Sequence, residues 1–167
     1  STRYAILTHD LGKGVSPRQD LPRHHGHERA SVRMAETLSI RLRVPQECAD
    51  AARLTARWHG VVHRAVELRP AMVLDLFGAT DALRRPERFT CVLDASAADA
   101  CSRPGAPQDY PQGAMLRDAL AVVRAVDAGA IARSVGVTGA GRDPGEAIAK
   151  AVRSARLATL RKWRRAR

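Results

Sequence analysis

The sequence predicts an all-α fold, and three observations support this. Apolar residues recur at three- and four-residue spacing along most of the chain, which is the period of an amphipathic helix. Prolines stand where several of these segments begin, in a first-turn position that helices tolerate. No alternating run of β-branched residues with hairpin turn signals is present. The 167 residues, 45% of them hydrophobic, suffice for a real core, and the lack of a run of about 18 apolar residues excludes a membrane-spanning helix.

Two amphipathic helices are expected in the first half of the chain. The first covers residues 28–42, and its apolar face comprises Val32, Ala35, Leu38 and Leu42. Pro45 opens the second helix, and Gly60 is expected to end it. The buried stripe of the second helix comprises Cys48, Ala52, Thr55 and Trp58.

Two further helices begin at Pro70 and Pro86. Their expected inward residues are Met72, Val73, Leu76 and Leu83 in the third helix and Phe89, Val92, Leu93 and Ala97 in the fourth. Residues 102–113 are rich in proline and are predicted to form a linker loop. The linker would join a domain at residues 1–101 to a C-terminal helical extension at residues 114–167.

The extension is expected to contain a helix over residues 114–126, a short segment near residues 130–134 and a last helix from Pro144 to the basic end of the chain. The inward residues of the last helix are Ile148, Val152, Ala155 and Leu160. The glycine-rich loop at residues 136–145 follows no strand and lacks a phosphate-loop lysine. It is therefore predicted to be a linker and not a nucleotide site.

The composition suggests a polyanionic partner in a reducing compartment. Lys and Arg number 28 against 17 Asp and Glu, which gives a net charge of +11 and suits nucleic acid. An Arg- and Ala-rich surface is also how high-GC genomes encode ordinary proteins, so composition alone leaves both interpretations open.

The three cysteines, Cys48, Cys91 and Cys101, have no metal-type spacing and are expected to be small buried hydrophobes in the cytoplasm. The first residues show neither a signal-peptide pattern nor an initiator Met, which predicts either a piece of a longer polypeptide or a processed N-terminus.

The histidines stand near carboxylates in the sequence. They are His9, then His24, His25 and His27, then His59 and His63, with Asp10 beside the first and Asp81 inside the third expected helix. Imidazoles mixed with carboxylates suit a first-row transition metal better than calcium, which prefers oxygen ligands alone. Helical bundles build such sites from inward-facing side chains of several helices.

The adjacent pair His9 and Asp10 constrains the geometry of such a site. Neighbouring residues of a regular helix point about 100° apart, so both reach one metal only at the centre of the inward face or where the helix unwinds. Gly12 and Gly14 are expected to supply the unwinding. Lys13 would then lie beside the metal and hold a phosphate oxygen, while the metal would activate a bound water at neutral pH.

Structural alternatives exist for these residues. His9 and Asp10 could form a charge-compensated helix C-terminus. The stretch of residues 22–28 could be a polar loop ending in a helix cap, which is the preferred interpretation of His24 and His25. His63 could be a solvated side chain one turn beyond His59. Asp81 is harder to dismiss, because a carboxylate on a mostly apolar helix needs a partner.

The segment His9-Asp10-Leu11-Gly12-Lys13-Gly14 resembles the signature of the HD superfamily of metal-dependent phosphohydrolases. Four further segments resemble, in the same order, the HD domain of bacterial multifunctional CCA-adding enzymes. They are Pro22-Arg23-His24-His25-Gly26-His27-Glu28, Arg41-Leu42-Arg43-Val44-Pro45, Asp81-Ala82-Leu83-Arg84-Arg85-Pro86 and Tyr110-Pro111-Gln112-Gly113. The similarity continues to Arg167 and covers essentially the whole chain.

The resemblance implies an all-α HD bundle attached to a tRNA nucleotidyltransferase. In that family the nucleotidyltransferase head adds C, C and A to the tRNA 3′ end with CTP, ATP and magnesium. The HD domain has 2′,3′-cyclic phosphodiesterase, 2′-nucleotidase and phosphatase activities, and the phosphatase activity is associated with nickel. The expected partners are therefore the tRNA 3′ end and the N-terminal nucleotidyltransferase region of the same polypeptide, with no membrane involved.

The resemblance also implies roles for individual residues. The metal ligands would be His9, Asp10, His27, His59 and Asp81, and the catalytic residues would be Asp10 and Lys13. The basic residues expected to contact phosphate or RNA are Arg84, Arg85, Arg161, Lys162, Arg164 and Arg165.

This sequence departs from the family pattern in two places. The first histidine of the superfamily normally precedes the dyad by some tens of residues, which would place it upstream of Ser1. The family often has an acidic residue after the histidine at position 59, whereas Gly60 stands here. The nucleotidyltransferase head is also absent, so this chain is not expected to add CCA by itself.

Our leading hypothesis is a phosphohydrolase that acts on phosphate esters, including cyclic phosphates at RNA ends, with a divalent transition metal. The first alternative is a non-catalytic RNA-binding module whose basic terminal helix anchors the tRNA backbone. The second is a structural helical domain that supports dimerisation of the parent enzyme, and the sequence leaves a monomer and a homodimer equally open.

Overall fold

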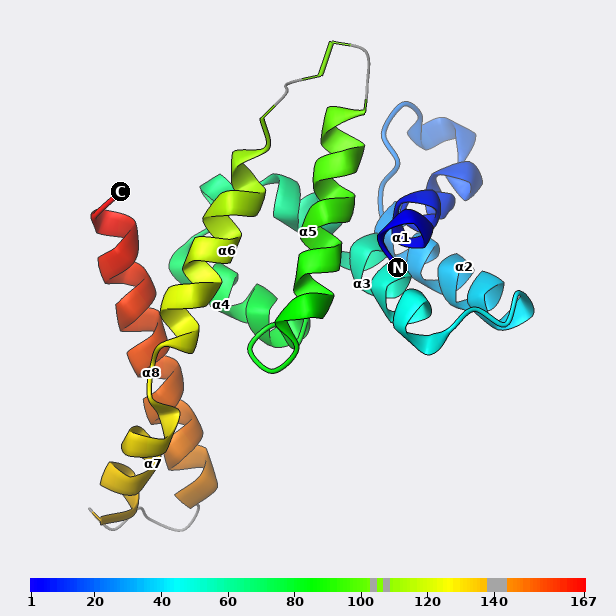
Figure 1. Cartoon of the computed structure of the whole chain (residues 1–167). Helices are drawn as coiled ribbons and strands as arrows, with labels where there is room; N and C mark the ends of the chain where they lie inside the picture. The colour runs from blue at the N-terminus through cyan, green and yellow to red at the C-terminus, as the bar shows by residue number, and fades with distance from the viewer. Residues whose placement is uncertain (103–104, 107–108, 138–143) are drawn as a thin grey trace.

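The computed structural model describes residues 1–102, 105–106, 109–137 and 144–167. These residues form α-helices and short 3-10 helices without a β-strand, which confirms the all-α fold class (Figure 1). The α-helices are α1 (Thr2–Thr8), α2 (His27–Arg41), α3 (Gln46–His63), α4 (Pro70–Ala79), α5 (Pro86–Cys101), α6 (Pro111–Arg124), α7 (Ala128–Val137) and α8 (Pro144–Arg165). The 3-10 helices are η1 (Leu11–Val15), η2 (Arg18–Asp20) and η3 (Ala65–Glu67).

Helix α3 is the centre of the N-terminal part, since α1, α2 and α5 all pack against it. Its alanines Ala51, Ala52 and Ala56 are buried, and such small side chains let neighbouring backbones approach closely. Ala51 belongs to a small cluster with Ala5 of α1 and Ala95 of α5. This packing brings the end of α1 and the start of α2 against the C-terminal half of α3, where the candidate ligands meet.

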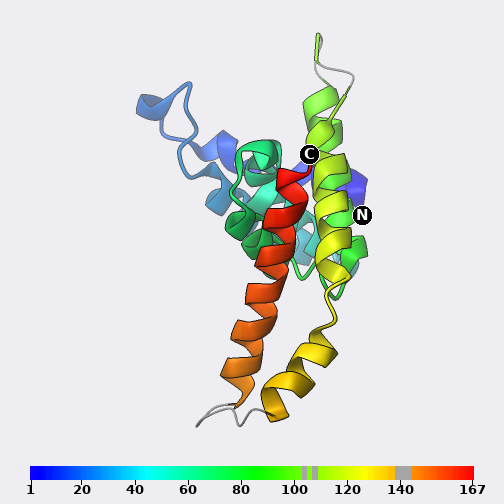
Figure 2. The same cartoon turned by 90° about the vertical axis from the view of Figure 1, so that its left-hand side faces the viewer.

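The main hydrophobic core lies between α3, α4, α5 and the C-terminal helices. Phe77 of α4 and Phe89 of α5 are fully buried and pack edge to face with ring centroids 5.5 Å apart. Leu116 of α6 and Leu160 of α8 belong to the same core. Figure 2 shows α6 and α8 side by side, in agreement with their contacts. The C-terminal helices therefore share one core with the helices that precede the predicted linker.

Several expectations about helix bounds and faces are wrong. Met72, expected to face inward, is 50% exposed, and Cys101, expected to be buried, is exposed. Gly60 does not end α3, which continues to His63 because Val62 extends its fully buried face. Helix α4 ends at Ala79, so Asp81 lies in the turn that follows and not inside a helix. Leu42, expected on a buried face, is 55% exposed because α2 has already ended at Arg41.

The ends of α2 and α4 have a common physical cause. Residue 81 adopts a left-handed φ of 54°, and the amide of Ala82 donates to the carbonyl of Phe77 at 2.9 Å. This is the Schellman arrangement, which stops a helix by turning its last carbonyls onto the following amides. Arg43 adopts the equivalent left-handed conformation after α2, with a φ of 50°.

The C-terminal expectations are met in outline by α6, α7 and α8. Residues 103–104 and 107–108 of the predicted linker, and residues 138–143 of the glycine-rich loop, lie outside the described residues.

Candidate metal centre

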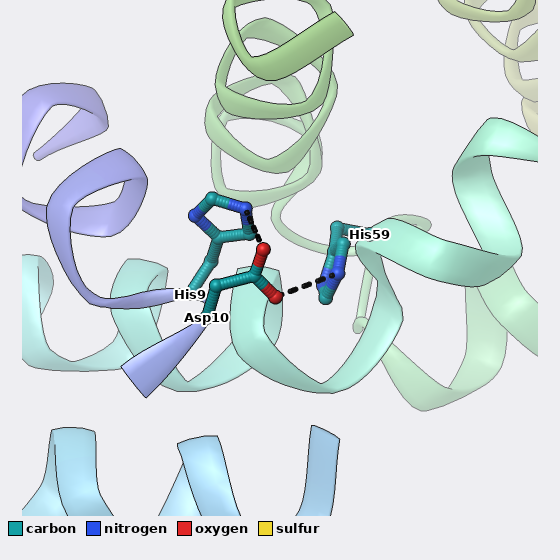
Figure 3. Close-up of side chains that lie close together, drawn as sticks. All are labelled: His9, Asp10 and His59. Atoms are coloured by element: carbon teal, nitrogen blue, oxygen red, sulfur yellow. Dashed lines mark ion pairs between the residues drawn. The ribbon is translucent and has the colours of Figure 1, made fainter. Parts of the chain in front are cut away.

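The end of α1 directs two neighbouring side chains to one point. His9 caps the C-terminus of α1 in a helical conformation, whereas Asp10 leaves the helix with φ −113° and ψ 13°. The Asp10 carboxylate therefore turns toward the ring of His9 and toward His59 of α3, as Figure 3 shows. The helix already ends at Thr8, so Gly12 and Gly14 do not cause the unwinding that was expected of them.

The rings of His9, His27 and His59 are all held in the same way. Each Nδ1 bonds a backbone carbonyl three or four residues earlier in the chain. The bonds run from His9 to Ile6 (2.7 Å), from His27 to His24 (2.7 Å) and from His59 to Thr55 (3.0 Å). A carbonyl oxygen only accepts, so Nδ1 carries the proton of each neutral ring and Nε2 presents a lone pair.

The three Nε2 atoms converge on the carboxylate of Asp10. His9 Nε2 lies 3.2 Å from Oδ2, while His27 Nε2 and His59 Nε2 lie 3.3 Å and 3.5 Å from Oδ1. The possible ligand atoms of His9, Asp10 and His59 all lie within 4.8 Å of one another. Within the described part of the chain, His9 Nε2, His27 Nε2 and Asp10 Oδ1 are buried without a hydrogen-bond partner.

Unpaired nitrogen lone pairs that face a carboxylate repel it, and a buried polar atom without a partner is costly. A cation placed among these atoms would satisfy all of them together. The hydrogen bonds from Nδ1 to backbone carbonyls are the usual way in which a protein fixes the orientation of a metal-binding histidine. The donor set of imidazole and carboxylate therefore fits a divalent transition metal.

The charges within the cluster set its protonation. Burial lowers the pKa of His9, but the hydrogen bond that the protonated ring would donate to Asp10, together with the charge of Asp10, outweighs burial and raises the pKa above 6.5. Burial, and then the neighbouring charge of His9, lowers the pKa of His59. Burial opposes the ionisation of Asp10, yet His9 and Lys13 hold its pKa well below the usual range. Asp10 is therefore a carboxylate at neutral pH, and His59 is a neutral ring, which are the forms that bind a metal.

The cluster opens into a cleft of about 360 Å³. Lys13 lies in this cleft with Nζ bonded to Asp10 Oδ2, and it is the only lysine or arginine among the described residues that line it. Glu28 and Gly60 face each other there, since a Cβ added at Gly60 would lie 3.7 Å from Glu28 Oε1. The lining residues are Asp10, Lys13, His27, Glu28, His59, Gly60, His63, Asp99 and Ala100.

Asp99, and not Asp81, supplies the second aspartate of the cleft. Asp99 Oδ1 lies 3.7 Å from His9 Nε2. Asp81, which was expected to complete the ligand set, is absent from the cleft lining, and its carboxylate bonds Arg84 at 2.7 Å. The bond with Arg84 also lowers the pKa of Asp81. The carboxylate of Asp81 thus has an exposed ion-pair partner in the turn after α4.

The sequence contains a signal for Asp99 that was overlooked. Like Asp81, Asp99 is a carboxylate in a mostly apolar stretch of sequence, since it follows Ala97 and Ala98 in α5. Only the packing of α5 against α1 and α3 distinguishes the two aspartates.

The remaining histidines fall into two groups. His24 Nδ1 bonds Ser16 Oγ at 2.8 Å and His25 is exposed, in the loop that ends at the N-cap Gly26. This is the polar-loop interpretation that the sequence favoured. His63 is not the solvated side chain considered above, because its Nε2 lies 3.3 Å from Asp99 Oδ2 and its Nδ1 lies 2.8 Å from the hydroxyl of Tyr110.

The basic residues expected to contact phosphate or RNA occupy three environments. Arg84 and Arg85 lie beside Asp81, outside the cleft. Arg164 is turned inward, and its guanidinium donates to the carbonyls of Leu68 and Val66. Arg161, Lys162 and Arg165 line a shallow depression on the exposed face of α8 together with Ala158 and Ala166.

The sequence profile of the HD domain matches residues 1–103, which is more than half of the chain and includes the whole cluster. The chain belongs to the HD domain family. It is also similar to proteins named Multifunctional CCA protein. The one from Burkholderia cenocepacia (strain HI2424) is 49% identical over 158 residues, which cover 94% of this chain and 37% of that protein. The one from Nitrosomonas eutropha is 51% identical over 140 residues, which cover 83% of this chain and 34% of that protein.

This HD chain thus spans about a third of the length of the curated relatives it matches. No solved structure matches it significantly. Within the described residues, no helix has the length and apolar character needed to cross a bilayer.

Proposed function

We propose that this HD domain is a metal-dependent phosphohydrolase. The observation that carries the proposal is the convergence of three histidine Nε2 atoms on the Asp10 carboxylate, with buried atoms that lack hydrogen-bond partners. His9, Asp10, His27 and His59 would hold the metal, with Asp99 beside them. A divalent metal bound there supplies Lewis-acid chemistry to a water and to a phosphoryl oxygen.

Other groups of the chain orient the metal ligands and bring positive charge to the cleft. The backbone carbonyls that bind each Nδ1 keep the Nε2 atoms aimed at the centre, so the site needs little rearrangement when the metal binds. Lys13 brings a cation to the cleft, where it can neutralise an oxygen of a phosphate ester. Because Arg84 and Arg85 lie outside the cleft lining, we assign the phosphate-facing role to Lys13 and not to these two arginines.

We propose nickel as the metal of this domain, since imidazole-rich sites favour the later transition metals. We further propose 2′,3′-cyclic phosphates, 2′-nucleotides and simple phosphate esters as the substrate class. The names of the relatives support an RNA 3′ end, and specifically that of tRNA, as the molecule that carries the ester. From the resemblance to CCA-adding enzymes we propose a cytoplasmic parent polypeptide in which a magnesium-dependent nucleotidyltransferase region precedes this domain.

We propose the boundaries 1–101 for the HD domain, 102–113 for the linker and 114–167 for the extension. The end of α5 at Cys101 and the HD match to residue 103 support the first boundary. The core that α6 and α8 share with α4 and α5 indicates that the extension folds together with the HD domain.

The test is hydrolysis of 2′,3′-cAMP and of a generic phosphate ester by the full-length protein with added nickel. We expect His9→Ala and Asp10→Ala to abolish turnover and to lower the bound metal measured by elemental analysis. His25→Ala is the matched control, since it removes an exposed histidine outside the cluster and should leave both quantities unchanged. Equal rates in all four proteins would refute the metal assignment.

A non-catalytic tRNA-binding role is the second candidate. It is favoured by Arg161, Lys162 and Arg165, which lie on one exposed face of α8 and have no ion-pair partner among the described residues. Each lysine or arginine that contacts a phosphate steepens the salt dependence of binding, by about 0.7 to 0.9 in the log–log slope. Salt-sensitive tRNA binding that weakens in Arg161→Ala, without bound metal or turnover in the intact protein, would favour this role.

A further inference from the structure

His63 is held differently from the three histidines of the cluster. Those rings turn Nδ1 to a carbonyl of their own segment, whereas His63 Nδ1 lies 2.8 Å from the hydroxyl of Tyr110, 47 residues away. The other nitrogen, Nε2, lies 3.3 Å from Asp99 Oδ2. His63 therefore bridges the residue before α6 and an aspartate of the cleft.

The two carboxylate oxygens of Asp99 face different histidines. Oδ2 faces His63, and Oδ1 lies 3.7 Å from His9 Nε2. When the hydroxyl of Tyr110 donates to Nδ1, the proton of a neutral His63 ring resides on Nε2 and is donated to Asp99. This tautomer fixes the rotation of the Asp99 carboxylate and turns Oδ1 toward the ligand cluster.

The Tyr110 hydroxyl is suited to be the hydrogen-bond donor at the start of the series Tyr110, His63 and Asp99. Burial, and then the charge of Asp99, raises the pKa of Tyr110, so the hydroxyl keeps its proton over the working pH range. The side-chain amide of Gln112 donates to the backbone carbonyl of His63 at 3.1 Å and provides a second attachment. Tyr110 precedes α6 and Gln112 lies in its first turn, so the end of the linker at residues 102–113 holds the end of α3 from outside the HD match.

We infer that Tyr110 is a positioning residue of the metal centre: through His63, its hydroxyl sets the orientation in which Asp99 faces the ligand cluster. The inference rests on the proposed function, because it assumes that the cluster binds a metal. The hydroxyl touches neither the ligand cluster nor the cleft centre, so its effect is transmitted by His63 and Asp99.

The test is Tyr110→Phe in the full-length protein, which removes the hydroxyl and keeps the ring beside His63. Tyr4→Phe is the matched control, because its hydroxyl bonds Ser39 Oγ at 2.9 Å between α1 and α2. Ni²⁺ is titrated by calorimetry into the metal-stripped proteins. We expect Tyr110→Phe to bind Ni²⁺ about 10- to 100-fold more weakly, which is the usual cost of losing a residue that orients metal ligands, and Tyr4→Phe to match the parent.

A direct readout of the tautomer separates positioning from a general structural role. Ring ¹⁵N NMR of the metal-free parent should show the His63 proton on Nε2, and Tyr110→Phe should shift or broaden this signal. A parent that binds no Ni²⁺ would overturn the proposed function, whereas equal affinity and an unchanged His63 signal in Tyr110→Phe would overturn this inference alone.

A second pair of variants, at His63, tests the same inference even if Tyr110→Phe does not fold. The amide of His63→Gln can still donate to Asp99, whereas His63→Phe cannot. We expect Ni²⁺ affinity to be better retained in His63→Gln. Equal losses in the two variants would contradict the transmission through a hydrogen bond.

Discussion

Of the glycines compared among the described residues, Gly12 is the one at which an added methyl group meets the tightest contacts. A Cβ at Gly12 would lie 2.2 Å from the carbonyl oxygen of His27 and 2.6 Å from the amide nitrogen of Ser31. Both contacts are with the backbone of α2, which cannot rotate away as a flexible side chain could. The amide of Gly12 also donates to Ser31 Oγ at 2.9 Å, which binds η1 to α2.

Gly12→Ala therefore forces α2 and η1 apart. The carbonyl oxygen of His27 must retreat from 2.2 Å to at least 3.0 Å, and Asp10 and His27 separate with it. Overpacking of a buried site costs about 1–3 kcal/mol, and we expect about 3 kcal/mol because the contacts are rigid. For a chain of this size, each 1 kcal/mol lowers Tm by about 2–4 °C, so the expected loss is roughly 6–12 °C.

The assay is thermal unfolding followed by circular dichroism, with Gly14→Ala as the control. Gly14 lies two residues further along the same 3-10 helix, and an added Cβ there meets nothing within 4 Å. Gly14→Ala should stay within about 0.5 kcal/mol of the parent or be slightly more stable. A Tm for Gly12→Ala within 2 °C of that of Gly14→Ala would refute the reasoning, since this difference corresponds to at most about 1 kcal/mol.

Two further predictions concern charge. In the metal-free protein Asp10 raises the pKa of His9, so Ni²⁺ affinity should fall as the pH drops through the pKa of His9. Asp10→Asn should lower the His9 midpoint measured by NMR titration, and an unshifted midpoint would contradict the coupling of the two residues. Arg164→Ala leaves the carbonyls of Val66 and Leu68 without their charged donor and should cost about 1.5–3 kcal/mol in denaturant unfolding, whereas the exposed Arg165→Ala should stay within about 0.5 kcal/mol. Equal losses in the two arginine variants would argue against the inward role of Arg164.

Local patterns in the sequence predicted most helices of the fold. The starts of α4 and α5 follow from Pro70 and Pro86, because a helix tolerates proline in its first turn and is broken by it further along. The ends were harder to predict. Gly60 was expected to stop α3, but glycine only weakens a helix, and the burial of Val62 outweighs that cost.

Part of the candidate site could likewise be predicted from the sequence, whereas another part depends on tertiary packing. The adjacency of His9 and Asp10 is visible in the sequence, and the resemblance to the HD family added His27 and His59, so these members of the cluster could be predicted. The choice between Asp81 and Asp99 could not, since both carboxylates stand beside alanines. The Schellman turn after α4 leaves Asp81 beside Arg84, whereas α5 packs against α1 and α3 and carries Asp99 to His9.

The sequence by itself thus determined the helices and the net charge, because these depend on residue type and on spacing within one or two helical turns, and its resemblance to the HD family implied His9, Asp10, His27 and His59 as the members of the cluster. Only the tertiary structure decided which aspartate joins that cluster, which arginines remain on the surface, and that Tyr110 reaches His63 across 47 residues. Such pairings are set by how the helices pack against one another, and a local pattern contains no information about contacts between segments distant in the chain.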